Sequence, residues 1–276
     1  MLCLIRTAAR CWPRSFCADL LFTFERRLNM TTLLLYKDIK PLNREEHQAL
    51  KLQPSENCAF AADTHLVPVA GLEFFQAARH YPLVFIGEGA QATPIALLGL
   101  AQGHNGYLDD ELRWQANTYI PAFIRRYPFV LAQDEASNFT VCFDAAFSGW
   151  NQQDGRDLFD AEGQNSAYLD EMIQFLQNFT AEMERTRAFV EKLNALELLA
   201  PRTIKLTHSS GESFVLSDFL AIDEEKFLAL SDEQVLELNR GGFLGWIYAH
   251  LMSLGNANQL FDSYLKAKPQ APVVTH

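Results

Sequence analysis

Two stretches of the chain, residues 71–100 and 121–143, repeat one order of apolar and polar positions. GLEFFQAARH has helical spacing and ends before Pro82, because a proline disfavours the helical region for the residue that precedes it. LVFI and PIALLGL then resemble two strands joined by the loop GEGAQA. Pro121 suits the first position of a helix, and AFIRRY is followed by the strands FVLA and FTVCF, with QDEASN between them. Each stretch therefore predicts a helix followed by a β-hairpin.

The same two stretches share a phrase, RHYPLVF at 79–85 and RRYPFVL at 125–131, which lie 46 positions apart. An arginine at the end of a helix complements the negative end of the helix dipole, and the proline ends the helix. The simplest interpretation is a repeated helix-to-hairpin junction, with a duplicated binding feature as the alternative. This interpretation leaves the tyrosine of each copy unexplained.

Apolar residues then recur at spacings of three and four, with Thr186 at the one polar step. They are Leu169, Met172, Leu176, Phe179, Met183, Val190 and Leu193. The pattern predicts one long amphipathic helix that runs to about Leu199 and is ended by Pro201. A coiled-coil dimer is an alternative, but the flanking charges are not orderly, so we expect the helix to pack on its own core. Before it, the polar residues 151–166 predict a loop or a seam between domains.

The C-terminal third predicts a hairpin around Ser210-Gly211, a short helix after Asp223, and further helices. Ser231 and Gln234 match a capping box, Gly241 and Gly242 interrupt the helix that follows, and Gly255 or Asn256 can cap it. With these glycines, Gly245 suggests close helix packing. The fold class is therefore α+β: repeated helix-to-β-hairpin units, then a long amphipathic helix and C-terminal helices. We expect one domain over residues 30–266 and a disordered tail at 267–276.

The charge of the chain disfavours nucleic acid as a partner. The net charge is −11, and residues 1–29 carry five arginines and two acidic residues, which leaves 18 basic and 32 acidic residues elsewhere. Nucleic-acid binding needs a basic face. No apolar window reaches the length of a membrane span, so the sequence predicts a soluble protein that does not span a membrane.

Residues 1–29 differ in composition from the rest, with three of the five cysteines and a methionine, Met30, directly after them. A targeting peptide and a secretion signal are two interpretations, although the apolar part is poor for a signal. We expect instead that translation begins at Met30, and that residues 1–29 are a non-native start or a disordered tail. The two cysteines that remain, Cys58 and Cys142, form no paired motif, which favours a reducing cytoplasm.

Sequence motifs give little support for catalysis or for a cofactor. Residues 87–92 fit G-x-G-x-x-A after a strand, but no crossover helix follows, so a hairpin loop is preferred to a dinucleotide site. No histidine begins a metal motif, and nothing pairs the acidic residues Glu88, Asp144, Asp160 and Glu162 as an acid and a base. We therefore expect no metal, no cofactor and no catalytic residues.

Aromatic and polar residues gather around the second Tyr-Pro phrase, and they are the candidate ligand-binding residues: Trp114, Asn117, Tyr119, Arg125, Arg126 and Tyr127, with Pro121 and Pro128. Arginine beside tyrosine and tryptophan suits recognition of a carboxylate or a planar ligand. The same residues equally suit a partly buried structural network. Under the ligand hypothesis, Arg126→Ala or Tyr127→Phe abolishes binding and leaves the melting temperature nearly unchanged.

Taken together, VPVAGLEFFQAARHYPLVF, WQANTYIPAFIRRYPFVL, LFDAEG, ELLAPRTIKL and GWIYAHLMSLGN resemble the SapC family of bacterial proteins over residues 31–266. The most distinctive phrase is YIPAFIRRYPF. The resemblance implies an association with bacterial surface layers, while the permease label often given to the family disagrees with the lack of membrane spans.

Family genes tend to lie near those for TonB-dependent receptors, tryptophan-halogenase-like flavoproteins and cupin-type oxygenases. The resemblance thus implies a non-catalytic binding or assembly accessory, cytoplasmic or at the cell surface. Its partner would be a protein, a peptide or a small molecule, or a second copy of the chain. The alternative is an enzyme of such a pathway, or the ligand-binding partner of one.

Overall fold

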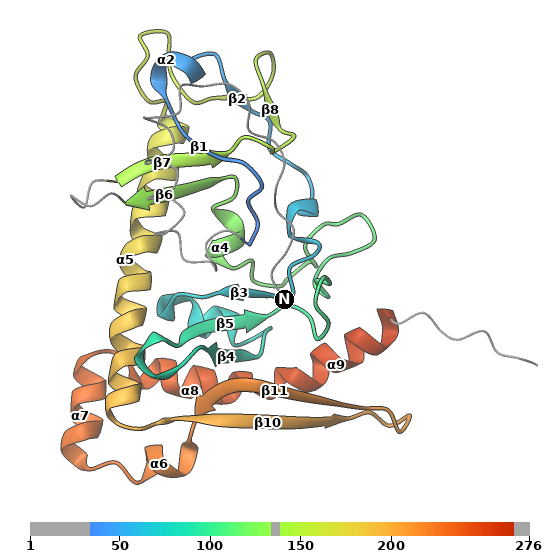
Figure 1. Ribbon diagram of the computed structural model, residues 1–276, viewed down its shortest axis with the longest axis vertical. Helices are drawn as coiled ribbons and strands as arrows, with labels where there is room; N and C mark the ends of the chain where they lie inside the picture. The colour runs from blue at the N-terminus through green and yellow to red at the C-terminus, as the bar shows by residue number, and fades with distance from the viewer. Residues whose placement is uncertain (1–33, 134–138, 268–276) are drawn as a thin grey trace, which may run out of the picture.

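The computed structural model describes residues 34–133 and 139–267. Expectations for residues 1–29, for most of the loop at 133–138 and for the tail after Ala267 lie outside these ranges. Within them, helices occur together with strands that form open antiparallel sheets (Figure 1). The α+β class predicted from the sequence is therefore confirmed.

Three antiparallel sheets organise the described chain. A five-stranded sheet has the order β10-β11-β4-β5-β3, and two three-stranded sheets have the orders β1-β7-β6 and β8-β2-β9. The strands are β1 (Ile39–Pro41), β2 (Lys51–Leu52), β3 (Leu66–Pro68), β4 (Leu83–Ile86), β5 (Thr93–Leu97), β6 (Phe129–Gln133), β7 (Phe139–Asp144), β8 (Trp150–Asn151), β9 (Arg156–Asp157), β10 (Leu199–Thr207) and β11 (Ser213–Ile222).

Both Tyr-Pro phrases join a short helix to a hairpin. In the first unit a 3₁₀ turn, η3 (Gly71–Glu73), and α3 (Phe74–Ala77) precede the β4–β5 hairpin, where Val84 pairs with Ile95. In the second, α4 (Ala122–Arg125) precedes the β6–β7 hairpin, where Val130 pairs with Cys142. The two hairpins belong to different sheets.

One long helix, α5 (Ala167–Ala195), runs along one side of the molecule past the five-stranded sheet and the β1-β7-β6 sheet, and it contacts β6, η3 and the turn η4 (Gly89–Gln91) (Figure 1). Ser166 caps its start by accepting a hydrogen bond from the Leu169 backbone N–H. Its buried residues join the protein's own core, as predicted, and they are Leu169, Leu176, Phe179, Thr186, Phe189, Val190 and Leu193. Thr186, the polar step in the stripe, accepts a hydrogen bond of 2.8 Å from the Gly71 N–H.

The predicted end of α5 near Leu199 was wrong. The helix ends at Ala195, because Glu197 adopts a left-handed backbone conformation with φ 54° and redirects the chain. Pro201 lies inside strand β10 and not at the end of the helix. Proline is compatible with the extended chain of this strand, which lies at the edge of its sheet.

The loop predicted for residues 151–166 is partly replaced by strands. β8 and β9 both pair with β2 in a small sheet. Gly155, at φ 120°, allows the chain to turn there, because a Cβ at this position would lie 2.5 Å from the Leu52 carbonyl oxygen. A seam between domains at this segment stays a prediction.

The C-terminal third contains the predicted hairpin, β10–β11, and after it the helices α6 (Glu224–Leu228), α7 (Asp232–Arg240), α8 (Leu244–Ser253) and α9 (Asn256–Ala267). Another short helix, α2 (Arg44–His47), lies between β1 and β2. The capping box at Ser231 is present, and Gly242, at φ 73°, separates α7 from α8. The prediction that Gly255 or Asn256 caps the preceding helix was wrong, because the C-cap of α8 is Leu254. Asn256 instead begins α9, and its side-chain amide donates to the carbonyls of Ala78 and Tyr81.

Candidate binding site at the second Tyr-Pro unit

The tyrosine of the first unit is a buried structural residue. The Tyr81 hydroxyl donates to the backbone carbonyl of Tyr119 and accepts from the indole N–H of Trp114 at 3.1 Å. Its ring is fully buried and packs edge-on against Tyr107, with centroids 4.5 Å apart. Burial raises the pKa of Tyr81 well above its usual value, so the phenol stays protonated at neutral pH.

A buried carboxylate, that of Glu73, joins the first unit to the second. It accepts hydrogen bonds from the backbone N–H of Ala70 at 3.1 Å, from the N–H of Ala122 at 2.6 Å and from the Tyr119 hydroxyl at 2.8 Å. Desolvation by burial, and secondarily the Glu73 charge, raise the pKa of Tyr119 to about 12. Glu73 and Tyr119 therefore hold the start of α4 against η3.

Arg125 extends this chain of contacts to the surface. Its Nη2 donates to the Tyr119 hydroxyl at 3.1 Å, and its Nε donates to the Ile120 carbonyl at 3.0 Å. The guanidinium carbon lies 5.2 Å from the ring centroid of Phe175 on α5 and 5.7 Å from that of Tyr119. The side chain thus turns back toward the segment before α4 and bonds to the Ile120 carbonyl there.

Arg126, the next residue, points into the protein. Its side chain is 6% exposed, and the guanidinium carbon lies 4.1 Å from the ring centroid of Phe123 and 5.2 Å from that of Phe179. It also hydrogen-bonds to the Tyr36 side chain, whose hydroxyl donates to the Phe129 carbonyl at 2.6 Å. Burial lowers the pKa of Arg126 and raises that of Tyr36 to about 12.

Tyr127 completes the second unit through a second buried carboxylate. Its hydroxyl donates to Asp144 Oδ2 at 3.1 Å, and its ring stacks on Phe60 with centroids 4.0 Å apart. Desolvation, and secondarily Asp144, raise the pKa of Tyr127 well above its usual value. The tyrosine that the sequence left unexplained is therefore a hydrogen-bond donor to the core in both units.

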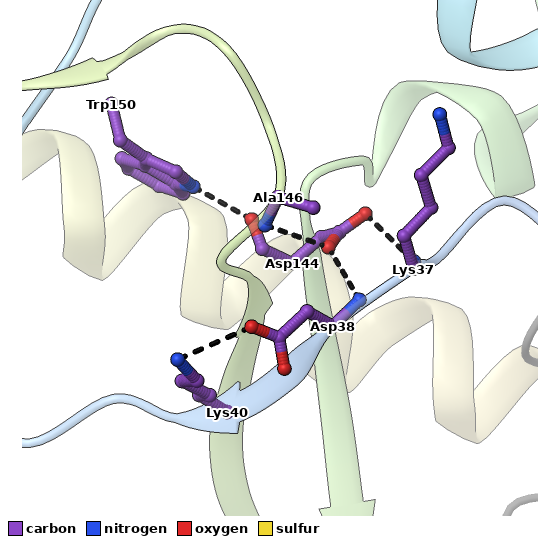
Figure 2. A network of polar contacts seen from close by, with 6 residues as sticks. All are labelled: Lys37, Asp38, Lys40, Asp144, Ala146 and Trp150. Carbon is purple, nitrogen blue, oxygen red and sulfur yellow. Dashed lines mark hydrogen bonds and ion pairs between the residues drawn. The ribbon is translucent and has the colours of Figure 1, made fainter. Parts of the chain in front are cut away.

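Asp144, at the end of β7, is the centre of the network in Figure 2. Its carboxylate is fully buried and accepts from the backbone N–H of Lys37 at 3.0 Å, Asp38 at 2.9 Å and Ala146 at 3.1 Å. Its backbone carbonyl accepts from the Trp150 indole N–H at 2.7 Å. This carboxylate connects β7 to the segment that precedes β1. The hydrogen bonds that it accepts all come from groups of the protein itself.

The structure thus divides the predicted cluster. Trp114 and Tyr119 belong with Tyr81 and Glu73, whereas Arg126 and Tyr127 belong with Tyr36 and Asp144. Arg125 lies at the surface end of the first group. Asn117 joins neither: it is exposed, at φ 62°, and its side chain makes no hydrogen bond within the described ranges. Glu73, Tyr36 and Tyr81 were missed as members because they are distant in sequence.

No cofactor or metal geometry accompanies these residues. In the part of the chain that the structure describes, no group of three or more His, Cys, Asp or Glu side chains could hold a metal ion. Residues 87–92 form the turn of the β4–β5 hairpin, so the hairpin-loop interpretation is confirmed. Over the same described residues, no helix has both the length and the apolar character to cross a membrane.

The chain was compared with protein families, curated proteins and solved structures. The SapC family model matches residues 42–260, most of the chain. No curated protein and no solved structure matches it. The chain therefore belongs to the SapC family, as the resemblance noted above indicated.

Proposed function

We propose that this SapC-family protein is a non-catalytic binding accessory that recognises a carboxylate group of a protein or peptide partner through Arg125. The observation that carries the proposal is the contrast within the cluster. Almost all of its polar groups are bound to other groups of the protein, while the Arg125 guanidinium is exposed and held in place.

The protonation of the tyrosines in the described cluster supports a non-catalytic role. General acids and bases need a pKa near the working pH, and burial raises the pKa of Tyr81, Tyr119 and Tyr127 away from neutrality. Both buried carboxylates accept hydrogen bonds from backbone N–H groups and thereby hold neighbouring segments of the chain together.

Arg125 supports the binding role. Its two hydrogen bonds go to neutral acceptors, and no carboxylate pairs with it within residues 34–133 and 139–267. Packing over Phe175 and Tyr119 fixes the plane of the guanidinium. A guanidinium that is already ordered loses little side-chain entropy when it binds a carboxylate through two parallel hydrogen bonds.

The wider setting follows from the family and belongs to the same proposal. An association with a surface layer requires the protein at the cell surface, whereas a role beside an uptake or modification system in the cytoplasm requires it inside the cell. Fractionation of the native bacterium, with the protein followed by mass spectrometry, separates the two. We propose the cytoplasm as its location, and recovery with the surface layer would overturn that assignment.

The binding role is tested with immobilised wild-type protein and two variants, Arg125→Gln and Arg187→Gln. Arg187 is a matched control, because it is an exposed arginine of α5 whose ion pair with Glu184 lies along the same helix. Each is incubated with extract of the native cells, and the retained proteins and peptides are quantified by mass spectrometry.

We expect one set of retained partners to fall at least tenfold with Arg125→Gln and to persist with Arg187→Gln, at unchanged melting temperatures. Equal retention by all three proteins would overturn the role of Arg125. Turnover of a retained small molecule by the wild-type protein would overturn the non-catalytic part and favour the enzyme alternative.

A further inference from the structure

Strand β11 joins the rest of its sheet through a single ladder pair with β4, in which Leu220 lies opposite Phe85. The two strands are antiparallel, so the next hydrogen-bonding pair in the same register would be Ile222 opposite Leu83. The ladder stops before that pair, although Ile222 is the last residue of β11 and Leu83 is the first of β4. The β10–β11 hairpin is therefore attached to β4 over a very short junction.

Two side chains of α8 take the place of the missing pair. The Ile222 N–H donates to His250 Nε2 at 3.0 Å, and the Leu83 N–H donates to Ser253 Oγ at 2.9 Å. The Ser253 hydroxyl donates in turn to the His250 carbonyl at 2.6 Å. Both α8 residues are fully buried, so they supply the acceptors that buried backbone N–H groups need. We call Leu83, Ile222, His250 and Ser253 the β4–β11 junction.

The junction requires a neutral imidazole at His250. A ring nitrogen that accepts a hydrogen bond carries no proton, so the one ring proton is on Nδ1. A second proton would place an N–H at Nε2 against the N–H of Ile222, and this backbone group would lose its acceptor. Burial lowers the pKa of His250 from 6.5 to about 3, because the charged ring is poorly solvated at this position.

Within the described residues, no charged group is placed to stabilise a protonated His250. Strand β4 and helix α3 contain no titratable residue. On α5, Arg185 lies over Trp246 of α8 and pairs with Glu182, and the Glu73 carboxylate of η3 is bonded to Ala122 and Tyr119. The charged residues of the other elements packed on α8 or next to them are exposed or half-buried, and they are Asp218, Asp223, Glu224, Glu225, Lys226, Asp232, Glu233, Glu237 and Arg240.

We infer that the β4–β11 junction is an acid-sensitive latch: protonation of His250 separates the β10–β11 hairpin from β4, while α5 and the β1-β7-β6 sheet stay folded. Separation lets water reach the imidazolium and the freed Ile222 N–H, both of which are costly to bury without a partner. Local opening is favoured over global unfolding because only one ladder pair has to break between the two strands. An open hairpin leaves β4 with an unpaired edge, to which another extended segment can bond.

The size of the effect follows from the pKa of His250 in the two forms. With the hairpin open, the imidazole is solvated and titrates at its ordinary pKa of 6.5. The open form then binds the proton more tightly, so the stability of the latch is complete above pH 6.5 and falls as the pH drops toward 3. Between pH 7 and pH 5 the opening equilibrium constant should rise about 25-fold.

The test is hydrogen–deuterium exchange of the full chain at pH 7, 6 and 5, measured by mass spectrometry and corrected for the intrinsic exchange rate at each pH. Peptides from residues 199–222 report on the hairpin, and peptides from α5 are the reference. His250→Gln keeps an acceptor for Ile222 without the titration, and Ser253→Ala removes the other bond of the junction. His208→Gln is the matched control, because this histidine lies at the turn of the same hairpin and bonds to Ser210.

We expect the protection of the hairpin in the wild type and in His208→Gln to fall about 25-fold from pH 7 to pH 5. The protection of α5 should change less than about threefold. His250→Gln should lose the pH dependence. Ser253→Ala should open about tenfold more at pH 7 and keep the pH dependence, so the inference stays testable if His250→Gln does not fold.

Three results would overturn the inference. They are a hairpin whose protection does not change with pH, an equal loss of protection in the hairpin and in α5, and an equal pH dependence in His250→Gln and the wild type. The latch is independent of Arg125, which lies on α4 and contacts α5. Arg125→Gln should exchange like the wild type, so failure of the latch leaves the proposed function untouched.

Discussion

The two Tyr-Pro units differ in what their side chains contact, although their sequences and local folds are alike. In the first unit the Tyr81 hydroxyl donates to a backbone carbonyl, and in the second the Tyr127 hydroxyl donates to the buried carboxylate of Asp144. The residue before the tyrosine is His80 in one copy, partly exposed, and the buried Arg126 in the other. The phrase therefore predicts a helix-to-hairpin junction in both units, and the residues packed around each unit determine what its side chains contact.

The largest expected effect comes from removing the carboxylate on which the second unit depends. Asp144→Ala leaves three backbone N–H groups and the Tyr127 hydroxyl without their acceptor. Because each buried unsatisfied group costs about 1–3 kcal/mol, we expect a loss of about 3–5 kcal/mol in the free energy of unfolding. Urea denaturation measures it. Asp38→Asn is the control, since that side chain is half-exposed and ion-paired to Lys40, and it should cost less than about 1 kcal/mol.

The first unit should instead be sensitive to acid, through a buried histidine that contacts its hairpin. His250 packs against Phe85 of β4, its Nε2 accepts from the Ile222 N–H at 3.0 Å, and burial lowers its pKa from 6.5 to about 3. The unfolded chain binds the proton more tightly, so this contribution to stability is complete above pH 6.5 and falls as the pH drops toward 3.

At pH 5 the protein should have lost about 2 kcal/mol relative to pH 7 through this group. His250→Gln keeps an acceptor without the titration, and its urea-denaturation midpoint should change less between the two pH values. An identical pH dependence in the variant and the wild type would remove His250 as the cause.

The tyrosine hydroxyls themselves should give a smaller contrast. Tyr81→Phe leaves a buried carbonyl and the Trp114 N–H without a partner, whereas Tyr127→Phe leaves Asp144 with its three backbone donors. We expect losses of about 2 kcal/mol and about 1 kcal/mol respectively. Equal losses, measured by thermal and urea unfolding, would remove the distinction between the two units.

Much of the fold could be predicted where the signals are local. Proline marks both junctions, Ser231 caps α7, and Ser210-Gly211 forms the tip of the β10–β11 hairpin. The end of α5 could not be predicted, because the left-handed residue is a glutamate and not the glycine or asparagine typical of that position. Strands β8 and β9 have two residues each, too few to show an alternating pattern.

The site was harder to predict because its partners are distant in sequence. Trp114 to Tyr127 form one run in the chain, but Glu73 lies 46 positions from Tyr119 and Tyr81 lies 33 positions from Trp114. Periodicity shows which residues face a core, and it does not show which polar groups meet across that core. The division of the cluster into two networks thus became visible only in three dimensions.

Adjacent residues of the same type, Arg125 and Arg126, allow the most direct test of the central claim, that Arg126 is a structural residue and Arg125 is the exposed binding residue. The measurement is the melting temperature of Arg125→Ala and of Arg126→Ala by differential scanning calorimetry. Arg126→Ala empties a buried site between Phe123 and Phe179, so we expect its melting temperature to fall by about 5 °C or more. Arg125→Ala should stay within about 2 °C of the wild type. A stable Arg126→Ala protein that no longer retains its partner would contradict this division and restore Arg126 to a binding role.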